Sequence, residues 1–221
     1  MTAIMLAGCN SFPGRPTQAE LPLRPSNVTD FATLYGENCA GCHGADGKSG
    51  AAIAMNNTVY LAIIDDASMR RIIAGGVFGT AMPPFAQSAG GSLTDRQINL
   101  LIAGIRKSWA GPPEAGSGAP PYSNSTPGDS NSGAQVYAAN CQSCHGADGK
   151  GGTAGSVVDA SYLSLVSDQY LRSIVIAGRP DLGHPDWKSA ASGHPLTPAQ
   201  VSDVVAWLAS KRSASPLAQS N

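Results

Sequence analysis

The chain has 221 residues, with 13% charged and 6% aromatic residues and a formal net charge of −1. This near-neutral balance argues against nucleic acid as a partner and against a strongly acidic substrate. The length allows one medium domain or two small ones. Because there are 26 glycines and 16 prolines, we expect small, loop-rich domains that depend on a bound group for part of their stability.

The N-terminal stretch, residues 6–9, reads Leu-Ala-Gly-Cys and resembles the lipobox of bacterial lipoproteins. In that family the chain is cut before the cysteine, whose thiol carries a diacylglycerol. The resemblance implies that residues 1–8 are the remnant of a signal peptide and that Cys9 becomes a lipidated N-terminus. Residues 1–8 are short for such a peptide and lack a basic region, and the alternative is a buried or free cysteine.

Residues 9–26 are rich in proline and polar groups, and we expect them to form a tether. No later segment approaches the ~20 apolar residues of a membrane-spanning helix. We therefore expect a protein anchored by lipid on the periplasmic side of a bacterial membrane, rather than one that crosses it.

A first domain is expected over residues 27–110. Asn27 or Thr29 is the expected cap of a helix that leads to residue 39. Residues 60–64 form a short apolar run, and a further helix is expected over 67–74. The last helix begins after Thr94, where Gln97 completes a capping box. Its apolar stripe consists of Ile98, Leu101, Ile102 and Ile105.

The most informative motif is Cys-x-x-Cys-His, which occurs at residues 39–43 and again at 141–145. This spacing is the attachment signature of a c-type haem: two thiols reach the two vinyl groups, and the histidine ligates the iron. A disulfide framework or a zinc site would use the same residue types, but neither explains a histidine directly after the second cysteine. We therefore predict two covalent haem c groups. Cys39 and Cys42 would attach the first haem and His43 would ligate its iron; Cys141, Cys144 and His145 would do the same in the second copy.

The two copies belong to a longer internal repeat. The same offset of 102 residues pairs Tyr35 with Tyr137 and Gly76 with Gly178. We predict a second domain over 131–212, a Pro/Gly/Ser-rich linker over 111–130 and a tail over 213–221.

Each half resembles a class I cytochrome c domain, in which an N-terminal helix, the haem motif, a loop, a middle helix and a ligand loop precede a C-terminal helix. The resemblance implies an all-α fold of a few helices around a covalent haem. It also implies a sixth iron ligand, usually a methionine on a proline-containing loop. Met82, followed by two prolines, fits this role. Met69 is better explained as core filler, and Met55 follows the motif too closely.

The second half has no methionine after Cys141. The repeat places His184 opposite Met82, with a proline next and an aromatic residue three positions on in both halves. We therefore expect His145 and His184 to ligate the second iron. His194 is the competing candidate, and an open or water-bound iron is the third possibility.

Other charged residues have open interpretations. Lys48 and Lys150 follow the two motifs and are either part of a docking rim or simply solvated. Arg70 and Arg172 occupy equivalent positions and either meet haem propionates or lie on exposed helix faces. The glycine-rich segments beside the lysines lack the spacing of a phosphate loop.

The expected function is electron transfer within or next to a respiratory or photosynthetic complex, without a small-molecule substrate, because no catalytic constellation is present. The alternatives are a redox enzyme of the peroxidase or thiosulfate-oxidising type with an open second iron, and a cytochrome subunit of a dehydrogenase. A methionine ligand raises the potential of haem iron, so electrons are expected to run from the second domain to the first.

Overall fold

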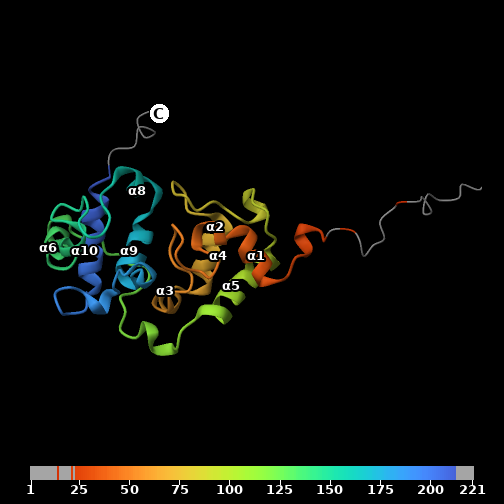
Figure 1. The fold of residues 1–221 in the computed structure, drawn as a ribbon, viewed down its shortest axis with the longest axis horizontal. Coiled ribbons are helices and arrows are strands. Elements are labelled where there is room, and N and C mark those ends of the chain that lie inside the picture. The colour runs from red at the N-terminus through yellow and green to blue at the C-terminus, as the bar shows by residue number, and fades with distance from the viewer. Residues whose placement is uncertain (1–13, 15–20, 22, 213–221) are drawn as a thin grey trace, which may run out of the picture.

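The computed structural model describes residues 14, 21 and 23–212, which form two helical lobes side by side (Figure 1). The expected lipidation site, Cys9, and the tail lie outside the described residues. Within the described part of the chain, β pairing is limited to two isolated bridges. The predicted all-α fold with two tandem domains is thus confirmed. No helix in this part is long and apolar enough to cross a membrane.

The first lobe contains one short 3₁₀ turn, η1, before its helices and a second, η2, before its last helix. Its elements are η1 (Pro25–Asn27), α1 (Phe31–Asn38), α2 (Ala40–His43), α3 (Thr58–Ile63), α4 (Asp66–Gly75), η2 (Gln87–Ala89) and α5 (Asp95–Trp109). The second lobe repeats the order of the five helices but has two 3₁₀ turns, η4 and η5, before its last helix. Its elements are α6 (Ser130–Asn140), α7 (Gln142–His145), α8 (Ala160–Leu165), α9 (Asp168–Ala177), η4 (Pro180–Leu182), η5 (Trp187–Ser189) and α10 (Pro198–Ala209).

The N-cap of α1 is Asp30, so the prediction of Asn27 or Thr29 is wrong. The Asp30 carboxylate accepts hydrogen bonds from the backbone N–H of Thr33 at 2.8 Å and from its hydroxyl at 2.9 Å. Asn27 instead belongs to η1. Asp30 lies directly before the first residue of α1, where its side chain reaches the free N–H groups of the first turn.

The last helix of the first lobe begins as the sequence predicts, and the last helix of the second lobe begins in the same way. Thr94 and Gln97 form a complete capping box on α5, and Thr197 and Gln200 form one on α10. The four residues of the predicted stripe on α5 are buried.

The first and last helices of each lobe cross closely, and a glycine lies at each crossing. A Cβ on Gly104 of α5 would lie 2.1 Å from the ring of Phe31, and a Cβ on Gly133 of α6 would lie 2.0 Å from the carbonyl oxygen of Asp203. The contact is therefore possible only without a side chain at these positions.

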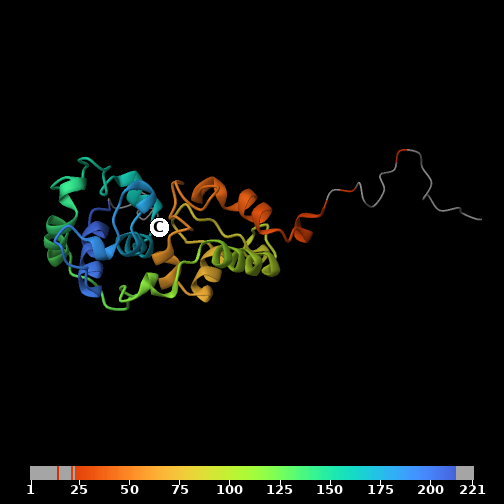
Figure 2. The same cartoon turned by 60° about the horizontal axis from the view of Figure 1, so that its bottom comes forward.

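The two lobes meet where α3 of the first faces α9 of the second, as both views show (Figures 1 and 2). The linker, which contains η3 (Pro113–Gly116), packs along this junction: Pro120 is fully buried, and the ring of Tyr122 lies 6.5 Å from that of Tyr60. Ala177 at the end of α9 belongs to the apolar core of the first lobe. The domains thus share a packed boundary.

Candidate haem-binding sites

Each Cys-x-x-Cys-His motif begins where one helix ends and the next starts. Cys39 is both the C-cap of α1 and the N-cap of α2, with φ −122° and ψ −36°. Cys141 has the same role between α6 and α7, with φ −122° and ψ −32°. The four motif cysteines form no disulfide bond, which argues against a disulfide framework. Among the described residues no group of three or more metal-ligating side chains is arranged for a zinc ion.

The histidine of each motif is oriented by one backbone carbonyl. His43 Nδ1 lies 2.8 Å from the oxygen of Ile53, and His145 Nδ1 lies 2.8 Å from the oxygen of Gly155. A carbonyl accepts only from a protonated Nδ1, so Nε2 of each ring is left with its lone pair for a metal. Burial lowers the pKa of His43, which favours the neutral, ligating form.

A tyrosine secures the residue after each motif. The hydroxyl of Tyr35 donates to the oxygen of Gly44 at 3.0 Å, and that of Tyr137 donates to the oxygen of Gly146 at 2.6 Å. These two glycines have φ of +84° and +80°, a left-handed conformation that favours glycine. The glycine-rich sequence after each motif is thus explained by the tight turn it makes.

The predicted sixth ligands lie on loops with matching backbone geometry. Val77 N–H donates to the oxygen of Met82 at 2.9 Å, and Arg179 N–H donates to the oxygen of His184 at 3.0 Å. A Cβ on the glycine before each donor would lie 2.8 Å from the Met82 oxygen and 2.7 Å from the His184 oxygen. Met82 and His184 therefore occupy equivalent positions in the two domains.

The second domain contains a cavity whose lining includes Cys141, His145 and His184. The rest of the lining is tyrosine and aliphatic: Tyr137, Val157, Tyr162, Leu171, Ile174, Val175, Val204 and Leu208. Such a mainly apolar wall with a few convergent polar groups suits a flat, largely apolar ligand.

The two histidine rings of this cavity have centroids 6.0 Å apart. Because an imidazole nitrogen binds a transition metal at roughly 2 Å, two imidazoles on opposite sides of one ion have ring centres about 6 Å apart. In addition, Nδ1 of His184 is buried and has no hydrogen-bond partner among the described residues. Burial lowers the pKa of His184, with the neighbouring His145 adding to the effect. These residues fit a haem held between two neutral imidazoles.

The remaining candidates lie elsewhere. His194 is exposed and does not line the cavity, and Lys48 and Lys150 are exposed. Arg70 is paired with Asp95 at 2.9 Å.

Arg172 matches neither interpretation offered by the sequence. It is buried, and its guanidinium donates to the carbonyl oxygens of Pro121 and Tyr122 in the linker. It therefore anchors the linker to α9.

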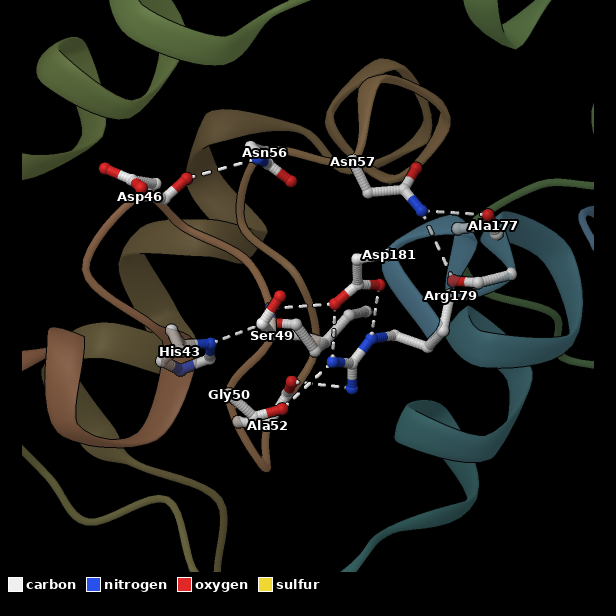
Figure 3. Close-up of polar contacts among 12 residues, drawn as sticks. His43, Asp46, Ser49, Gly50, Ala52, Asn56, Asn57, Ala177, Arg179 and Asp181 are labelled. Atoms are coloured by element: carbon white, nitrogen blue, oxygen red, sulfur yellow. Dashed lines mark hydrogen bonds and ion pairs between the residues drawn. The ribbon is translucent and has the colours of Figure 1, made fainter. Parts of the chain in front are cut away.

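Sequence reasoning missed one polar cluster, which joins the domains (Figure 3). Arg179 and Asp181, from the loop before His184, form a buried ion pair that contacts the loop after the first haem motif. The repeat contains a signal for them, because the first domain has Val77 and Gly79 at these positions. A charged pair that replaces an apolar residue and a glycine marks a feature specific to the second domain.

Each half of the repeat matches a family model of cytochrome c type. Residues 26–103 match the family model described as cytochrome c oxidase, cbb3-type, subunit III, and residues 130–211 match the cytochrome c model. One relative is the cbb3-type cytochrome c oxidase subunit FixP of Sinorhizobium medicae (strain WSM419), with 29% identity over 74% of this chain. Another is subunit FixPc of Rhizobium leguminosarum bv. viciae, with 28% identity over 58% of this chain.

The chain spans 58% and 42% of the lengths of these two relatives. Among solved structures, the Kuenenia stuttgartiensis reducing HAO-like protein complex Kustc0457/Kustc0458 matches 87% of this chain and 100% of its own chain. That match has 15% identity and a TM-score of 0.48. With two motifs of closely similar backbone geometry and a cytochrome c-type model matched by each half, the chain is a di-haem cytochrome c built from two tandem cytochrome c domains.

Proposed function

We propose that this protein transfers electrons as the di-haem cytochrome subunit of a membrane oxidase complex of the cbb3 type. The proposal depends mainly on one observation: the ring centroids of His145 and His184 lie 6.0 Å apart. If both histidines ligate the second iron, no coordination position is left there for a substrate. The names of the matched relatives, subunits of cbb3-type oxidases, support the choice of complex.

The ligand sets differ between the domains in this proposal. His43 and Met82 ligate the first iron, whereas His145 and His184 ligate the second. Haem iron carries one electron by alternating between its ferrous and ferric states. The thioether of Met82 favours the ferrous state more than the imidazole of His184 does. The first domain then has the higher potential, and electrons enter through the second domain and leave through the first.

We further propose that a lipid on Cys9 holds the protein at the periplasmic face of the membrane. The support is the Leu-Ala-Gly-Cys sequence at residues 6–9. Mass spectrometry of the membrane-extracted protein tests this. A diacylglycerol on Cys9, lost together with membrane association in a Cys9→Ala variant, is the expected result; an unmodified Cys9 in membrane-bound protein contradicts it.

Redox titration of the purified protein, combined with a pyridine haemochrome count, tests the ligation. The oxidised protein should show the methionine–iron charge-transfer band for one haem of every two. Met82→His should remove the band and narrow the gap between the two potentials, and His184→Met should add a second band. An unchanged gap in both variants contradicts the assignment.

Exogenous ligands separate this function from the enzyme alternative. Carbon monoxide and cyanide should bind slowly to the as-isolated protein, since each iron must first lose a protein ligand. Rapid binding at one haem would instead favour a redox enzyme with an open second iron. Co-purification with a dehydrogenase rather than an oxidase would favour the third interpretation.

A further inference from the structure

Arg179 and Asp181 form a charge pair in the boundary between the two domains, with only 7% and 6% of their side chains exposed. The contact is bidentate: Nε of Arg179 lies 2.9 Å from one carboxylate oxygen of Asp181, and Nη2 lies 2.8 Å from the other. We refer to these two residues as the interdomain clamp.

The clamp binds the first domain through its backbone (Figure 3). Arg179 donates to the carbonyl oxygens of Ala52 and Gly50, each at 2.9 Å, and Asp181 accepts the N–H of Ser49 at 2.8 Å. The pair accepts from one backbone N–H and donates to two carbonyls, so it matches this one stretch of loop in one register.

The loop that the clamp binds is the one that orients the proximal ligand of the first haem. Ile53, next to Ala52, supplies the carbonyl that accepts from His43 Nδ1. The loop also lies directly on the haem motif: Ala52 N–H donates to the oxygen of Cys42 at 2.9 Å, and a Cβ on Gly50 would lie 2.2 Å from that oxygen. A shift of this loop would therefore move His43.

On its other side, the clamp is part of the distal ligand loop of the second haem. The backbone N–H of Arg179 donates to the oxygen of His184, and the N–H of His184 donates to the oxygen of Arg179, both at 3.0 Å. One residue therefore contacts the frameworks of two proposed iron ligands, His43 and His184. The connecting route consists of the Arg179 side chain and a few hydrogen bonds.

Stability alone does not account for the clamp. The first domain folds with Val77 and Gly79 at the equivalent positions, and α3 and α9 already pack across the boundary. Burying two charges carries a desolvation cost that apolar residues of similar volume would avoid. What the ion pair adds is register, because its directional hydrogen bonds are satisfied in one docked arrangement.

Asn57 strengthens this arrangement. Its Oδ1 accepts from Tyr60 N–H as the cap of α3, while Nδ2 donates to the oxygens of Ala177 and Gly178 at 2.9 and 3.3 Å. The start of α3 in the first domain is thereby tied to the end of α9 in the second.

We propose that Arg179 and Asp181 are positioning residues for electron exchange between the two haems. The exchange moves one electron from ferrous iron in the second domain to ferric iron in the first, and no bond is made or broken. The clamp holds the two ligand frameworks at one separation and supplies a bonded route between them. This inference rests on the proposed electron-transfer function and assigns the contact on which internal transfer depends.

The test uses the full-length holoprotein and three variants. Arg179→Val introduces the residue found at the equivalent position of the first domain, and Asp181→Asn removes the charge at nearly constant volume. Arg212→Val is the matched control, because Arg212 binds Asp168 and the carbonyls of Leu163 and Val166 entirely within the second domain.

Two quantities are measured: the rate of electron redistribution between the haems after rapid photoreduction, and the haem–haem distance distribution by pulsed electron paramagnetic resonance. Both clamp variants should broaden the distance distribution. They should also slow redistribution at least about tenfold, because truncating one partner of a buried, hydrogen-bonded charge pair weakens docking by at least that factor. The ligation spectra of both haems should stay as in the wild type, and the control should keep the wild-type rate and distance.

A wild-type rate and distance in both clamp variants would overturn the proposal, as would equal slowing in the control. If Arg179→Val does not incorporate haem, the result for Asp181→Asn decides the test alone. That variant keeps the Arg179 cation and leaves the side chain at position 181 nearly unchanged in size. The ligation spectra of the wild type report separately on the proposed function. An open second iron would refute that function while the distance measurement still tested the clamp.

Discussion

Arg179 and His184 pair through their backbones, each donating its N–H to the carbonyl of the other at 3.0 Å. In the first domain only one of these two bonds has a counterpart: Val77 N–H donates to the oxygen of Met82 at 2.9 Å, whereas Met82 N–H donates to the hydroxyl of Thr80 at 3.2 Å. The loops thus share one closing hydrogen bond and differ in the side chains they present: a thioether in one domain, and an imidazole with an interdomain cation in the other. Under the proposed ligation, one fold would provide two different iron environments.

Replacement of His184 should open the second iron, whereas replacement of His194 should not. His184 lines the cavity opposite His145, and His194 is exposed. We expect His184→Ala to bind cyanide rapidly at one haem and His194→Ala to behave as the wild type, measured by stopped-flow spectroscopy. Rapid binding in His194→Ala alone would assign the ligand role to His194 instead.

Gly76→Ala should disturb the Met82 loop, and the neighbouring Gly75→Ala serves as its control. Gly76 has φ of +66°, and its Cβ would lie 2.6 Å from Pro84 N and 2.8 Å from the Met82 oxygen. The variant should lose stability and weaken the methionine–iron band. A Cβ on Gly75, the last residue of α4, has no atom within 4 Å, so that variant should keep both the band and the stability of the wild type. An undiminished band in Gly76→Ala would contradict this account.

The clamp should lose its contribution to stability in acid. Its hydrogen bonds with Arg179 lower the pKa of Asp181 from 3.8 to about 2. A depressed folded-state pKa stabilises the fold above the unfolded value and ceases to do so as the pH falls through the folded value. The stability advantage of the wild type over Asp181→Asn should therefore be constant above pH 3.8 and decline toward about pH 2. Denaturant titrations of both proteins across this range measure it, and an advantage that persists at the acid end would refute it.

The capping boxes should contribute equally to the two domains. Thr94→Ala and Thr197→Ala each remove the side-chain acceptor at the start of the last helix, and each should cost about 1 kcal/mol. Thr→Ser at the same positions retains an acceptor and should cost less. Thermal unfolding of the four variants provides the comparison; equal losses for alanine and serine would show that the hydroxyl does not cap.

The sequence alone determined the features that depend on short stretches of chain. The Cys-x-x-Cys-His spacing and the capping box of Thr94 and Gln97 on α5 each involve groups within a few residues of one another. The sequence also predicted that Met82 and His184 occupy equivalent positions, because the 102-residue offset of the repeat persists through the ligand loop. One local prediction was wrong: α1 is capped by Asp30, whose carboxylate accepts from Thr33 N–H, and not by Asn27 or Thr29.

Tertiary structure alone decided the contacts between distant residues. Arg172 looked like its counterpart Arg70, yet it is buried against the linker, since only the fold brings residues 121–122 over α9. The bonds from Arg179 to Gly50 and Ala52 join positions 129 and 127 residues apart. No periodicity or spacing in the sequence encodes such a contact. It forms only when the two folded domains pack together and bury Arg179 and Asp181 between them.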